Sequence, residues 1–169
     1  MSCKKEESDT VNSISDNNFY MMIGTSLINC YVDIYNQNLA GKPTGSQNIT
    51  ADGPMGGTVF ITGTTTYDDT HGITTTDLLF DLYNLNYTYT YTDNGGKTWQ
   101  TQLNIIGSTT YSGSFSSDYT SVNHQSENLQ IHGTVSYDGT SRMIDSNGPV
   151  NINRSNNTSV NIFGHVVSW

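Results

Sequence analysis

Between residues 18 and 40 the apolar side chains recur every three or four positions, which is the period of an α-helix. The positions concerned are Tyr20, Ile23, Leu27, Tyr31 and Ile34. Polar residues 16 to 18 can cap the start of such a helix, and Gly41 and Pro43 would end it. The pattern predicts one amphipathic helix over about residues 18–40 with Cys30 as a small buried side chain.

After the glycine-rich segment 53–57 the pattern changes to the alternation that is typical of β-strands. A weak repeat of the form apolar-x-Ile-x-Gly occurs at residues 59–63, 103–107, 129–133 and 160–164. Side chains two positions apart share one face of a strand, so each copy places an aliphatic residue, an isoleucine and a glycine together. We predict that this face forms the core and that the opposite face is exposed to water.

A glycine on the buried face of a strand needs a reason, because it weakens the strand. We expect the repeat glycines to form a shallow trough in which the helix lies. On this hypothesis a larger side chain at Gly107 or Gly133 would collide with the helix and destabilise the domain.

Further strands are predicted around residues 75–83, 87–92 and 149–154, with a hairpin turn at residues 93–96 and a long loop over residues 112–126. The repeat glycines are unevenly spaced, which excludes a regular solenoid. The predicted fold is mainly β, a twisted antiparallel sheet or partial barrel of about six to eight strands packed on one N-terminal helix. We assign residues 17–169 to a single β-rich domain.

Charge narrows the classes of partner. The 169 residues include 6 basic and 15 acidic side chains, which gives a net charge of −9. A nucleic acid is therefore not expected to bind. The sequence also lacks an apolar run of the roughly 20 residues that a membrane-spanning helix needs.

Residues 1–16 are polar and serine-rich, which is typical of a flexible tether. Within them, Ser2-Cys3 followed by Lys4-Lys5-Glu6-Glu7 resembles the start of a mature bacterial lipoprotein whose signal peptide has been replaced by a start methionine. The run from lysine to acidic residues also resembles the export signal of Bacteroidota surface lipoproteins. An ordinary polar start of a cytosolic protein is the alternative.

The resemblance implies a lipid on Cys3 and a location at the outer membrane, exposed to the cell surface. It also implies that Thr10, in Asp9-Thr10-Val11, is an acceptor for O-glycosylation. The membrane would then be contacted through the lipid alone.

No enzymatic motif is expected. The four histidines, His71, His124, His132 and His165, lack the spacing of metal ligands, and there is no nucleophile elbow or phosphate-binding loop. We therefore predict no catalytic residues, no metal and no cofactor.

Aromatic residues form the most distinctive remaining pattern. Tyr87, Tyr89 and Tyr91 would share one face of a strand, with Trp99 across the hairpin. Such rings can stack on sugars or bind a protein surface. The alternative is that they are core residues or simple cross-strand pairs.

These observations predict a non-enzymatic cell-surface lipoprotein of binding or structural type, with a glycan or a protein as ligand. One alternative is a carbohydrate-binding module that uses the Tyr/Trp platform. A second is a small carrier with an apolar cavity between helix and sheet. A surface hydrolase is disfavoured, because no activated nucleophile or metal set is evident.

Overall fold

A computed structural model describes residues 13–41 and 44–169 of the chain. Cys3 and Thr10 lie outside these ranges. One helix, α1 (Asp16–Asn38), precedes the strands β1 (Gly45–Asp52), β2 (Thr58–Asp68), β3 (Ile73–Thr92), β4 (Thr98–Phe115), β5 (Thr120–Tyr137), β6 (Thr140–Arg154), β7 (Ser159–Ile162) and β8 (His165–Ser168). Among the described residues no helix is both long and apolar enough to cross a membrane.

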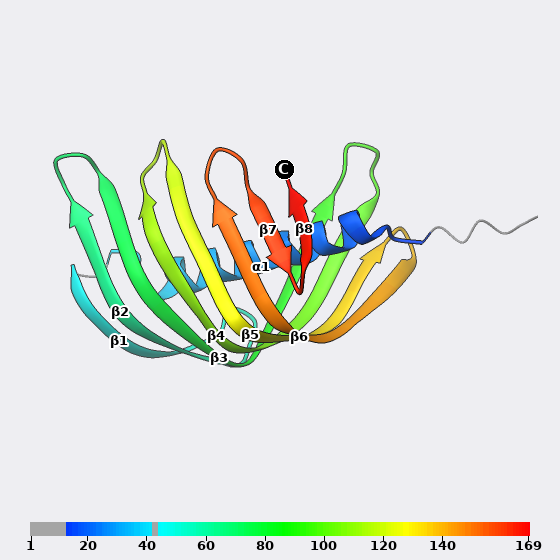
Figure 1. The fold of residues 1–169 in the computed structure, drawn as a ribbon, viewed down its shortest axis with the longest axis horizontal. Coiled ribbons are helices and arrows are strands. Elements are labelled where there is room, and N and C mark those ends of the chain that lie inside the picture. The colour runs from blue at the N-terminus through cyan, green and yellow to red at the C-terminus, as the bar shows by residue number, and fades with distance from the viewer. Residues whose placement is uncertain (1–12, 42–43) are drawn as a thin grey trace, which may run out of the picture.

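The eight strands form one antiparallel sheet in which every strand pairs with its neighbour in sequence, from β1 to β8. The sheet is twisted and does not close, and α1 lies along its concave side, as Figure 1 shows. The predicted mainly β fold with one N-terminal helix is confirmed. We call the concave side of the sheet the trough.

The long strands β3, β4 and β5 carry an irregularity near the middle of their length. The register shifts between Leu82 and Leu85, between Ile106 and Thr110, and between Ser126 and Leu129. Bulges of this kind bend a strand and increase its twist. These positions face one another across the sheet, and in Figure 1 the strands curve around α1.

The core lies between α1 and the concave face of the sheet. The aliphatic positions of all four sequence repeats are buried there, as expected: Val59, Ile61, Leu103, Ile105, Leu129, Ile131, Val160 and Ile162. From α1 they meet Phe19, Ile23, Leu27, Cys30, Tyr31 and Ile34, which are also buried. Full burial of an aliphatic side chain contributes about 1.5–3 kcal/mol, so this interface is the main source of stability.

Polar contacts fix the direction of α1 in the trough. Ser15 caps its first turn by accepting a hydrogen bond from the backbone N–H of Asn18, and Arg142 of β6 pairs with Asp16 at 2.5 Å. Further along, the Tyr87 hydroxyl donates to the Asp33 carboxylate at 2.6 Å. The helix therefore begins beside β6 and runs toward β3. It starts and ends two residues earlier in the sequence than the predicted range 18–40.

The repeat glycines have a different role from the one predicted. Gly133 has a φ of +150°, and a Cβ atom there would lie 1.9 Å from the carbonyl oxygen of Gln102 on β4. At Gly63 and Gly107 the nearest atom would likewise be a backbone oxygen of the adjacent strand. The prediction that the repeat glycines make room for the helix is therefore wrong, because these three glycines allow the backbones of two adjacent strands to approach each other. The fourth repeat glycine, Gly164, lies in the turn between β7 and β8.

The segment 112–126, predicted as a loop, instead ends β4 and starts β5. Its outward side chains are Ser, Asn and Gln, which hides the alternation in the sequence. The inward positions Val122 and His124 are buried, and His124 lies between the rings of Tyr31 and Tyr111 at 4.7 and 4.6 Å.

We expect Gly133→Ala to destabilise the protein by at least ~2 kcal/mol, because it combines backbone strain with a collision against β4. Gly139→Ala is the matched control, since Gly139 has a φ of +84° but no atom within 4 Å of its Cβ position. The control should cost about 1 kcal/mol. Urea unfolding measures both, and equal losses would contradict the close-approach explanation.

Burial at His124 makes the stability depend on pH. Burial, with a smaller contribution from Arg154, lowers the pKa of His124 from 6.5 to about 3. The folded state therefore keeps His124 neutral where the unfolded state binds a proton, so stability is lost as the pH falls below 6.5.

Between pH 8 and pH 5 we expect wild type to lose about 2 kcal/mol more than His124→Phe. Phenylalanine suits the site, because neither ring nitrogen of His124 has a hydrogen-bond partner among the described residues. Unfolding at pH 8 gives the reference, where the histidine is neutral in both states. Parallel pH profiles for the two proteins would refute this assignment.

Candidate functional site

An open groove of about 630 Å³ lies at the end of the trough where α1 finishes. We call it the end groove. Its walls come from the last turns of α1, from Gly41 and Thr44, and from the end of β2, the start of β3 and the end of β4. Six of the residues that line it are Tyr35, Leu39, Thr65, Tyr67, Thr74 and Phe115.

Tyr35 of α1 connects the end groove to the core. Its ring stacks on Tyr111 with centroids 5.8 Å apart, and the ring of Phe115 meets it edge-on at 5.2 Å. Burial raises the pKa of the Tyr35 hydroxyl, while a hydrogen bond with the Thr74 side chain opposes this rise. Tyr35 and Phe115 therefore form a fixed wall with a neutral hydroxyl.

Tyr67 forms the opposite wall. It continues the inward-facing series of Val59, Ile61 and Thr65 along β2, yet 58% of its surface is exposed, because the strand runs beyond the end of α1. Its backbone N–H donates to the Thr44 hydroxyl at 3.0 Å, which anchors the strand end. The Tyr67 ring is thus positioned by the sheet but available to a ligand.

Hydroxyl and amide groups supply the polar part of the end groove. Thr65 accepts a hydrogen bond from the Gln47 side chain at 3.0 Å, and Thr44, Thr66 and Asn36 complete the polar lining. None of the described lining residues carries a charge. Aromatic rings and hydroxyl groups side by side can contact a molecule that offers both flat apolar faces and hydrogen-bonding groups.

The structure divides the aromatic residues that the sequence suggests as a platform. Tyr87 is 5% exposed and bonded to Asp33, and Trp99 is 9% exposed and stacked on Tyr137 at 4.0 Å. Tyr89 is partly buried, and Tyr91 is 46% exposed. The four rings do not form one open platform, because α1 covers part of their face.

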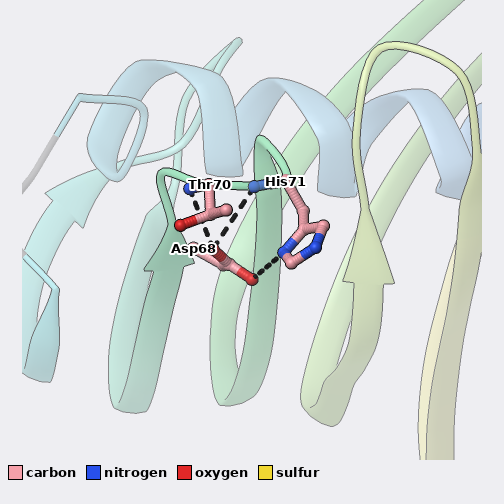
Figure 2. Close-up of polar contacts among 3 residues, drawn as sticks. All are labelled: Asp68, Thr70 and His71. Atoms are coloured by element: carbon pink, nitrogen blue, oxygen red, sulfur yellow. Dashed lines mark hydrogen bonds and ion pairs between the residues drawn. The ribbon is translucent and has the colours of Figure 1, made fainter.

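The histidines occupy separate places. His124 is in the core, whereas His132 of β5 pairs with Asp145 of β6 at 2.6 Å on the outer face of the sheet. His71 belongs to the turn between β2 and β3, shown in Figure 2.

In that turn Asp68 accepts hydrogen bonds from the backbone N–H groups of Thr70 and His71, and its other carboxylate oxygen lies 2.7 Å from Nδ1 of His71. The hydrogen bond with His71 lowers the pKa of Asp68. Both side chains are exposed, so the arrangement acts as a turn cap. Across the described part of the chain no three His, Cys, Asp or Glu residues converge to hold a metal ion.

Sequence reasoning missed the end groove. Its residues are far apart in the chain, so no local pattern identifies them together. The one local signal was a tyrosine four positions after a repeat glycine, but this signal is ambiguous, because Tyr67 is exposed and Tyr111 is buried. Comparison of the chain with protein-family models, with curated proteins and with solved structures finds no match.

Proposed function

We propose that this protein is a non-enzymatic binding protein of the bacterial cell surface that holds a small uncharged ligand in the end groove. The observation that carries the proposal is the groove itself, which is open and whose described lining residues supply three aromatic rings, threonine hydroxyls and other uncharged groups. Its volume falls within the roughly 300–1,000 Å³ of typical ligand sites.

The lining favours binding over turnover. Its described residues include no His, Asp, Glu, Lys or Cys. General acid–base catalysis and covalent catalysis at neutral pH depend on such groups or on a hydroxyl activated by one of them. Burial raises the pKa of the Tyr35 hydroxyl, which therefore remains protonated at neutral pH.

We propose the end groove as the ligand site, and not the space beneath α1. The side chains at the centre of the interface, such as Leu27, Phe80 and Ile105, are essentially inaccessible to solvent. A carrier with its cavity under the helix would have to separate these close-packed side chains, and their packing stabilises the domain.

The surface location rests on the resemblance of residues 2–11. A lipid on Cys3 would hold the chain at the outer membrane, with each buried methylene contributing about 0.8 kcal/mol. The tether enters the domain at the start of α1, and the 23 residues of this helix place its end about 35 Å further along. The end groove would thus face away from the anchored end.

To test the groove, we expect Ala40→Trp to abolish binding by filling it from an exposed position. The measurement is ligand-observed NMR with a library of uncharged and charged small molecules. Thr62→Trp on the outer face of β2 is the control and should keep the uncharged ligands seen with wild type. Hits that survive in Ala40→Trp, or that are all charged, would reject the end groove as the binding site.

To test the location, the gene is expressed with its native upstream region and the cells are fed an alkyne-labelled fatty acid. We expect wild type and Ser2→Ala to be labelled and to be cleaved by protease added to intact cells. Cys3→Ser should lose the label, because the other cysteine, Cys30, is buried in the core and cannot accept the lipid in its place. An unlabelled and protease-protected wild type would overturn the lipoprotein assignment.

A further inference from the structure

We infer that the ligand of the end groove is a neutral saccharide, with one sugar ring stacked on Tyr67 and its hydroxyls bonded to the threonine and amide side chains. This inference rests on the proposed function and names its ligand class.

Tyr67 carries the stacking part of the inference. Its side chain lies on the inward face of β2, and the inward-facing residues before it on this strand are part of the core. More than half of its surface is nevertheless exposed, and none of the described aromatic rings stacks on it. A tyrosine offers a large rigid surface that loses little conformational entropy on binding. The C–H faces of a sugar ring match such a surface, because they are apolar and flat.

The polar groups of the groove match the edges of a sugar. Threonine and tyrosine hydroxyls both donate and accept hydrogen bonds, as sugar hydroxyls do. The Thr74 hydroxyl lies beside that of Tyr35, and Thr65 beside the Gln47 amide, so two donor–acceptor pairs already exist in the wall. Exposed Asn36 adds a planar amide, which can bond two adjacent hydroxyls at once.

The same lining disfavours the other ligand classes. A charged ligand would lose hydration without gaining an ionic partner from the described lining residues, which are neutral. A lipid chain would need a deep aliphatic channel, whereas Leu39 and Ala40 are the aliphatic residues among the described lining of this open groove. A neutral molecule with alternating apolar faces and hydroxyl edges fits both constraints.

Tyr83 offers a matched comparison. It is exposed to a similar degree, 55%, but it lies on the outer face of the sheet, within the bulge between Leu82 and Leu85. Its ring meets Phe60 edge-on at 5.3 Å. Replacement of either tyrosine removes a ring of equal size and similar exposure, so a difference between them reports the site and not the loss of a tyrosine.

The test is isothermal titration of the protein with neutral tetrasaccharides of glucose, mannose, xylose and N-acetylglucosamine. We expect at least one to bind, Tyr67→Ala to weaken it at least tenfold, and Tyr67→Phe to restore binding, because the ring and not the hydroxyl makes the contact. Tyr83→Ala should stay within twofold of wild type.

Two outcomes overturn the inference and separate it from the proposed function. If no tetrasaccharide binds while uncharged compounds still bind in a manner that Ala40→Trp abolishes, the ligand class is wrong and the groove remains a binding site. If a tetrasaccharide binds equally to wild type and Tyr67→Ala, the stacking site is wrong. Failure of both the saccharide titration and the compound screen would remove the proposed function as well.

Discussion

The structure depends on the burial of one face of α1 against the concave face of the sheet. An open antiparallel sheet with one apolar face cannot remain in water uncovered, and no second sheet is present in the described part of the chain. A single helix of 23 residues supplies the cover. The sheet must therefore curve until its strands reach the sides of the helix, and the bulges and close-approach glycines of the long strands provide that curvature.

This constraint also explains where the end groove arises. The helix ends at Asn38, with Leu39 packed inward, while β2 and β4 continue beyond it. At the end of β2 the inward-facing Tyr67 is left exposed, whereas Phe115 at the end of β4 still contacts Tyr35 of α1. A cover shorter than the trough leaves an end open, and the side chains there combine the aromatic character of the core with the hydroxyls of the rim.

The core beneath α1 contains buried polar groups that lower the stability of the fold. His124 is held neutral between two tyrosine rings, and its nitrogens and the Ser126 hydroxyl have no hydrogen-bond partner among the described residues. Such groups each cost about 1–3 kcal/mol when buried. The end groove differs in this respect, because its walls are arranged in hydroxyl and amide pairs, Tyr35 with Thr74 and Thr65 with Gln47.

The sequence by itself determined the helix, the buried face of each repeat and the antiparallel β class, because these follow from the period of apolar side chains along the chain. It could not separate Tyr67 from Tyr111, which share one local pattern, since exposure depends on where α1 ends relative to β2 and β4. Nor could it show that Tyr83 and Tyr87 lie on opposite faces of β3, because a bulge at Asn84 reverses the alternation of side chains without a strong local signal. Tertiary structure decided these points, since pairing register and helix cover join residues that are distant in sequence.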